Sequence, residues 1–182
     1  MNKAAFVCEN DSSVSGKMLL ISTSALEVSM SIYLVQHGLC LPKDIDPSRG
    51  LSDEGMKKVG MIAEVAAGYK VQADSIMHSG KKRAKQTAEI FAAALKPSGG
   101  VFVRKGLAPM DDAGKVAMEL DPASNMMLVG HLPFMERLVS QLTTGSTEHR
   151  PFKFQNGGIV CLDRDDPKEK WYVKWALMPD IS

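Results

Sequence analysis

The strongest constraint on the fold is an alternation of short apolar runs with amphipathic segments of helical spacing. Short runs rich in β-branched and apolar residues predict strands at residues 31–35, 71–77, 101–104 and 126–129. Segments with a helical period lie between and after them, at residues 52–68, 82–95, 113–120 and 133–145. Strands that alternate with helices usually pair in parallel, so the chain is predicted to be an α/β protein with a mostly parallel sheet.

Two details of this prediction concern particular side chains. The first helix is expected to begin after Ser52 and to bury one apolar face, made of Met56, Val59, Ile62, Ala63 and Ala66. The last third of the chain has a different residue pattern, in which residues 158–162 and 171–175 predict two strands of a closing hairpin. Trp171 and Trp175 are expected to lie on the same side of its second strand.

Length and composition restrict the remaining possibilities. A chain of 182 residues suits one domain, which we assign to residues 30–182, with residues 1–29 as a poorly ordered N-terminal extension. A net charge of +1 argues against nucleic-acid or membrane-surface partners. No apolar run is long enough to cross a bilayer. The three cysteines have unrelated spacings, which predicts reduced thiols and a cytoplasmic location.

Polar groups follow three of the predicted strands. They are Gln36-His37-Gly38, Ser79 with Arg83 four residues on, and Gly130-His131. The carboxyl ends of parallel strands face one crevice, so these groups are expected to converge. An imidazole beside a guanidinium suits phosphoryl transfer, because the ring can attack phosphorus while the guanidinium holds its oxygens. A second, protonated histidine would add another donor.

Four segments together resemble the histidine phosphatase superfamily, and within it the small SixA-type phosphohistidine phosphatases. They are YLVQHG at residues 33–38, RGLSDEG at 49–55, HSGKKRAKQTA at 78–88 and LVGHLP at 128–133. The resemblance covers about residues 30–178. It implies a three-layer α/β/α sandwich of the phosphoglycerate-mutase-like kind. It also implies that His37 becomes phosphorylated and that Arg83 and His131 line the phosphate pocket.

The sequence departs from that family at one position. The family's usual Arg-His-Gly is here Gln36-His37-Gly38, so a fixed positive charge beside the nucleophile is missing. Gln36 can still donate a hydrogen bond to phosphate, and Arg49 is the candidate replacement for the charge. His78 and Ser79 are candidates for supporting the site. The charges around Arg83, at Lys81, Lys82 and Lys85, are typical of a solvated helix start.

The expected activity is that of a phosphatase without metal or other cofactor. Its substrate is expected to be a phosphohistidine on a protein, such as a phosphotransfer domain or a phosphotransferase-system component. Two alternatives stay open: a weak or inactive phosphate-binding module, because of Gln36, or a small-molecule phosphomonoesterase. The second needs an acid, for which Asp111 or Asp112 is the candidate. The Cys-x5-Arg and P-loop patterns are absent from the sequence.

Overall fold

A six-stranded mixed sheet forms the centre of the molecule. The computed structural model describes residues 31–166 and 168–180, so the predicted N-terminal extension lies outside the described residues. The strand order is β3-β2-β4-β1-β5-β6. The first four strands, β1 (Ile32–Gln36), β2 (Ser75–His78), β3 (Val101–Val103) and β4 (Met126–Gly130), run parallel. The strands β5 (Ile159–Asp163) and β6 (Tyr172–Leu177) form the predicted antiparallel hairpin, which pairs with β1 through β5.

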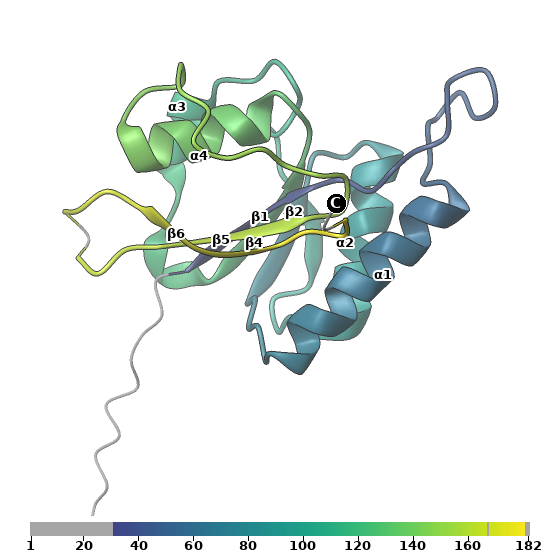
Figure 1. Cartoon of the computed structure of the whole chain (residues 1–182), viewed down its shortest axis with the longest axis horizontal. Coiled ribbons are helices and arrows are strands. Elements are labelled where there is room, and N and C mark those ends of the chain that lie inside the picture. Colours follow the sequence, from purple (N-terminus) through teal and green to yellow (C-terminus); the bar gives the residue numbers. More distant parts are fainter. Residues whose placement is uncertain (1–30, 167, 181–182) are drawn as a thin grey trace, which may run out of the picture.

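Helices cover both faces of this sheet. α1 (Asp53–Gly68) and α2 (Lys82–Leu95) pack on one face, and α3 (Ala113–Glu119) and α4 (Phe134–Thr144) pack on the other (Figure 1). A short 3-10 helix (Pro122–Ser124) precedes β4. The predicted α/β class and the three layers are therefore confirmed. Helices that alternate with the strands cover both faces of the sheet, so both faces are apolar.

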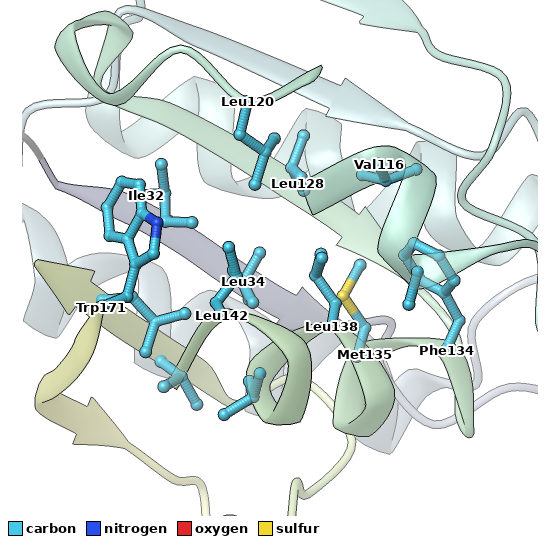
Figure 2. Close-up of a cluster of buried hydrophobic side chains, with 14 of the residues drawn as sticks. Ile32, Leu34, Val116, Leu120, Leu128, Phe134, Met135, Leu138, Leu142 and Trp171 are labelled. Atoms are coloured by element: carbon cyan, nitrogen blue, oxygen red, sulfur yellow. The ribbon is translucent and has the colours of Figure 1, made fainter. Parts of the chain in front are cut away.

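Each face of the sheet has its own hydrophobic core. Under α3 and α4, Ile32 and Leu34 of β1 and Leu128 of β4 belong to one buried cluster with Leu138 of α4 (Figure 2). Under α1 and α2, the alternate residues of the same strands, such as Val35 and Val129, contact Phe91 of α2 and Val59 of α1. The strand β1 is thus buried on both faces, which explains why its sequence is apolar without alternation.

Two local predictions were wrong in detail. The strand predicted at residues 71–77 is β2 and begins at Ser75, because the backbone N–H of Val71 still bonds to Ala66 of α1 and turns the chain away. The side chain of Met56 is 41% exposed, and the buried residue at this end of α1 is Gly55 instead. A β-carbon at Gly55 would overlap the carbonyl oxygen of Leu39, so a glycine is needed where the helix crosses the loop after β1.

The two tryptophans lie on opposite faces of the sheet, contrary to the expectation. Trp171 joins the core under α4, whereas Trp175 packs against the ring of Tyr33 on the α1 side. The pairing of β5 with β6 explains this, since Cys161 pairs with Trp175 while Leu162 pairs with Val173. One extra residue on β6 is a β-bulge, and a bulge reverses the face on which later side chains fall.

None of the helices within residues 31–180 that the structure describes is long and apolar enough to span a membrane.

Candidate active site

Three neighbouring strands bring the candidate residues to one edge of the sheet. β2, β4 and β1 lie side by side, and Gln36 pairs with Gly130 at their carboxyl ends. His37 follows β1 directly, and its backbone N–H donates to the Gly130 carbonyl over 3.1 Å. His131 follows β4, and Ser79 follows β2. The convergence that the strand ends predicted is therefore present in the fold.

The ring of His37 is held with one nitrogen available for attack. Its Nδ1 lies 2.7 Å from the carbonyl oxygen of Gly38. A carbonyl can only accept, so Nδ1 carries the hydrogen and Nε2 keeps its lone pair. The Nε–H of Arg83 donates to this Nε2 over 3.0 Å. The guanidinium therefore already lies where a phosphoryl group on Nε2 would bind.

His131 lies against His37 and is supported by Ser79. The centroids of the two imidazole rings are 4.9 Å apart, and the Ser79 hydroxyl lies 2.6 Å from Nε2 of His131. The Nδ1 of His131 is buried and has no hydrogen-bond partner among the described residues. A buried polar atom without a partner is costly, so this nitrogen is a candidate contact for a bound phosphoryl oxygen.

Burial disfavours the charged form of both imidazoles. Burial lowers the pKa of His37 to about 4 and the pKa of His131 to about 3, and the Arg83 charge adds to both effects. This burial disfavours the protonated second histidine that the sequence reasoning expected. A bound phosphoryl dianion would favour the charged imidazole and would therefore raise these lowered pKa values.

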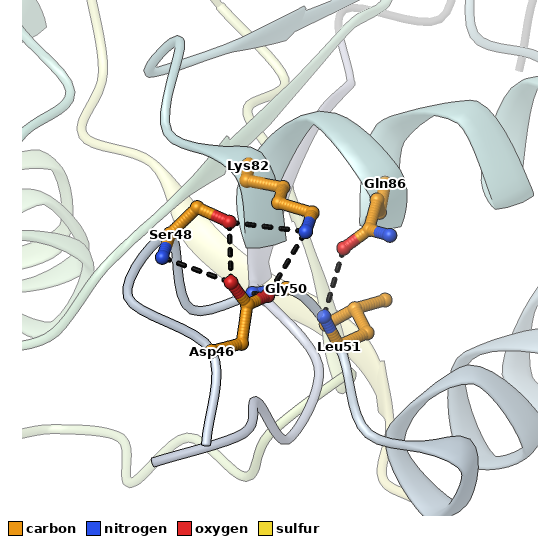
Figure 3. Close-up of polar contacts among 6 residues, drawn as sticks. All are labelled: Asp46, Ser48, Gly50, Leu51, Lys82 and Gln86. Carbon is orange, nitrogen blue, oxygen red and sulfur yellow. Dashed lines mark hydrogen bonds and ion pairs between the residues drawn. The ribbon is translucent and has the colours of Figure 1, made fainter. Parts of the chain in front are cut away.

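Arg49 lies in the loop after β1, which several hydrogen bonds hold in place. Asp46 accepts hydrogen bonds from the hydroxyl of Ser48, the backbone N–H of Gly50 and the ammonium of Lys82 (Figure 3). The Ser48 hydroxyl contributes most to holding the pKa of Asp46 well below its usual range. Gln86 adds a second tie, because its Oε1 accepts from the backbone N–H of Leu51 (Figure 3). Together these bonds attach the loop after β1 to the first turns of α2.

Arg49 lies near the histidines without touching them. Its Nη2 contacts the Sγ of Cys40 at 3.3 Å, and its charge contributes to the lowered pKa values of His37, His131 and Arg83. Gln36 is 8% exposed, and its Oε1 is buried with no partner among the described residues. The charges that act most strongly on the two histidines are thus all positive, although the residue before His37 is neutral.

The chain resembles known proteins over most of its length. No protein-family model matches it. It is 26% identical to the phosphohistidine phosphatase SixA of Escherichia coli over 156 residues, which are 82% of this chain and 94% of that protein. It is 30% identical to an uncharacterized protein of Picosynechococcus over 142 residues, which are 73% of this chain and 84% of that protein. The chain belongs to the histidine phosphatase superfamily, SixA type.

The solved structures agree with this membership at the level of the fold. A structure of the protein histidine phosphatase SixA in complex with tungstate superposes with a TM-score of 0.71 and 24% identity. The match covers 82% of this chain and 97% of that one. The phosphoglycerate-mutase-like fold expected from the sequence is therefore confirmed.

The remaining candidates of this SixA-type chain lie outside the contact between the two histidines. Nδ1 of His78 accepts from the backbone N–H of Gly80 and so supports the turn after β2. Asp111 accepts from the backbone N–H of Ala108, and Asp112 caps α3. Both carboxylates line a pocket of about 630 Å³, whose lining includes neither His37 nor His131. The described residues contain no cluster of three or more histidine, cysteine, aspartate or glutamate side chains that could hold a metal ion.

Two residues of the site were missed by the sequence reasoning. The buried hydroxyl of Thr87 accepts from the backbone N–H of Gly38 and donates to the Arg83 carbonyl. The side-chain amide of Asn156 donates to the carbonyl of His37 over 3.0 Å, from a loop 119 residues further along the chain. Both hold the backbone at His37 and Gly38 without touching the His37 ring. Thr87 follows Arg83 by one helical turn, which is a usable signal, whereas nothing in the sequence pointed to Asn156.

Proposed function

We propose that the protein removes phosphate from a phosphohistidine on another protein, through a phosphohistidine at His37. The observation that carries this proposal is the state of the His37 ring, with Nδ1–H bound to Gly38 and Nε2 facing Arg83 at 3.0 Å. In a neutral imidazole whose Nδ1–H donates to a carbonyl, Nε2 carries the lone pair and can act as the nucleophile. The name of the Escherichia coli relative supports the same activity.

The proposed reaction has two displacements at phosphorus. First, the Nε2 lone pair of His37 forms a bond to phosphorus while the bond from phosphorus to the substrate nitrogen breaks. The substrate imidazole leaves with a proton on its other nitrogen and is released neutral. Water then attacks the phosphoryl group, the bond to Nε2 breaks, and inorganic phosphate departs while its proton goes to solvent. Arg83 and His131 hold the phosphoryl oxygens in both steps, with Gln36 and Arg49 beside them.

A nitrogen leaving group fits this site better than an alkoxide. An ester needs an acid to protonate the leaving oxygen, whereas the imidazole of phosphohistidine can carry its proton at neutral pH. Burial has the largest effect on the pKa of both His37 and His131, and no carboxylate is among the groups with the largest effects on either ring. Asp111 and Asp112 are each bonded to the backbone of their own segment. The phosphomonoesterase alternative therefore lacks a placed acid.

A macromolecular substrate suits the loop beside the nucleophile. The segment between β1 and α1, residues 37–52, is attached to α2 by the bond from the Lys82 ammonium to Asp46. Leu39 and Ile45 expose apolar side chains on this segment. The partner is proposed to be a phosphotransfer domain or a phosphotransferase-system component.

The test is turnover of a histidine phosphotransfer domain phosphorylated with ³²P, assayed with excess EDTA. The protein is compared with His37→Ala and with His149→Ala, which removes an exposed histidine as a matched control. We expect phosphate release by the unchanged protein and by His149→Ala. We also expect acid-labile label on the protein after a denaturing quench at neutral pH, and neither signal with His37→Ala.

The other outcomes separate the alternatives. Tungstate binding without release or label would overturn the enzyme and leave a binding module. Hydrolysis of p-nitrophenyl phosphate that is faster than release from the phosphoprotein would favour the phosphomonoesterase, and loss of that hydrolysis in Asp111→Asn or Asp112→Asn would identify its acid. Loss of turnover in EDTA alone would contradict the proposed independence from metal.

A further inference from the structure

The position before the nucleophile leaves a deficit of positive charge. Gln36 is almost completely buried, and its side chain is neutral. An amide can donate one hydrogen bond to a phosphoryl oxygen, but it supplies no charge. The dianion that the proposed reaction handles therefore meets one positive charge fewer at this position, and Arg49, the replacement expected from the sequence, bonds to Cys40 without touching either histidine.

Lys81 occupies the segment that contacts both histidines. Two residues before it, Ser79 reaches His131, and two residues after it, Arg83 reaches His37. Lys81 itself is the extended residue that precedes α2, and its side chain makes no cap for that helix. Its backbone is therefore anchored between two residues of the site, while its long side chain is left for another role.

The ammonium of Lys81 differs from its neighbours in being uncommitted. Lys82 bonds to Asp46 and Ser48, and Lys85 is paired with Glu89 one turn further along α2. Lys81 has no ion pair or side-chain hydrogen bond within the part of the chain that the structure describes. The charge of Lys81 nevertheless reaches both rings, because it contributes to the lowered pKa of His37 and of His131.

We propose that Lys81 binds the phosphoryl group directly and supplies the positive charge that Gln36 does not. This inference rests on the proposed function of the site. The ammonium acts as a mobile point charge on a flexible stem, unlike the rigid fork of an arginine. Lys81 is then a binding residue for phosphoryl oxygens, and the sequence expectation of a solvated helix start is incomplete at this one lysine.

The first experiment compares Lys81→Ala with Lys85→Ala, which removes the same charge from an exposed position on the same helix. The probe is tungstate, measured by calorimetry at two salt concentrations, and turnover of the phosphorylated phosphotransfer domain is measured in parallel. We expect Lys81→Ala to weaken tungstate binding about tenfold or more and to lower kcat/KM at least as much. Lys85→Ala should change either value less than twofold, and both melting temperatures should stay unchanged.

A second experiment tests whether Lys81 supplies the same charge to the phosphoryl group that an arginine at position 36 would supply. Gln36→Arg is made in the unchanged protein and in Lys81→Ala, which gives a double-mutant cycle. We expect the arginine to restore most of the lost affinity in Lys81→Ala and to add less in the presence of Lys81. Equal effects of Gln36→Arg in both backgrounds would overturn the shared role.

The two proposals can fail separately. If the unchanged protein turns over substrate but Lys81→Ala behaves like Lys85→Ala, the Lys81 proposal is wrong and the proposed function stands. If the unchanged protein binds tungstate with a contribution from Lys81 but never turns over substrate, the Lys81 proposal survives as phosphate binding and the enzyme proposal fails.

Discussion

The hydroxyl of Thr87 accepts a hydrogen bond of 3.0 Å from the backbone N–H of Gly38. The same hydroxyl donates to the carbonyl of Arg83. This buried side chain therefore links the backbone of Gly38, next to His37, to Arg83. The relative position of His37 and Arg83 therefore depends on α2 as a whole.

Removing this hydroxyl should cost both stability and activity. Thr87→Val keeps the shape of the side chain but leaves the Gly38 N–H buried without a partner, which costs about 1–3 kcal/mol. We expect this loss in the free energy of unfolding by urea, with a fall in kcat. Thr143→Val is the control, because Thr143 bonds only to a carbonyl of its own helix. Equal losses in the two variants would contradict the tie to Gly38.

Two glycines of α1 should respond in opposite directions to alanine. A β-carbon at Gly55 would overlap the Leu39 carbonyl, whereas a β-carbon at Gly60 would meet nothing within 4 Å. We expect Gly55→Ala to destabilise the fold by about 1–3 kcal/mol through overpacking. Gly60→Ala should stabilise it by about 0.5–1 kcal/mol through helix propensity. Denaturant unfolding measures both, and a neutral Gly55→Ala would remove the packing argument.

The stability of the protein should fall as the pH drops from about 6.5 to about 4. The folded pKa of His37 is about 4 against an ordinary 6.5, mainly because the ring is buried, so the unfolded chain binds more protons in this window. Its contribution is at most about 3 kcal/mol. Stability measured at several pH values should vary less steeply in His37→Gln than in the unchanged protein. The same slope in both would argue against the depressed pKa of His37.

Ser79 should act on the reaction through His131. Its hydroxyl lies 2.6 Å from Nε2 of that ring, so Ser79→Ala frees the imidazole to rotate. We expect kcat to fall about tenfold, equivalent to about 1.4 kcal/mol, while the melting temperature changes little. Ser124→Ala, which removes an exposed hydroxyl bonded to Asp121, should leave kcat unchanged. A rise in KM with unchanged kcat would assign Ser79 to substrate binding instead.

The sequence predicted those features that depend on local pattern. The strand ends carrying His37 and His131 were identified because each follows a short apolar run closed by a glycine or by a helix start. The limits of α2 were predicted to the residue. Periodicity could not show that Gly55 replaces Met56 on the buried face, because this depends on how closely α1 approaches Leu39.

Features that depend on distant partners could not be predicted. The opposite placement of Trp171 and Trp175 comes from the bulge in β6, which only the pairing with β5 determines. Asn156 supports His37 from the loop before the neighbouring strand β5, and no local pattern marks a side chain whose partner is a backbone carbonyl so far away in the sequence. The lowered pKa of His131 likewise follows from burial and from the charges beside it, which a spacing of motifs does not reveal.

The pairing of β1 with β5 has a consequence for the order in which the protein can mature at the ribosome. β1 is made first among the strands, yet one of its two edges is covered only by β5, and the loop with Asn156 arrives just ahead of that strand. Until then the growing chain presents an apolar strand edge, which is a hazard for association with other chains. Synthesis of the last strands therefore both protects the nascent domain and fixes the backbone of His37, so the candidate site is complete only when the sheet is complete.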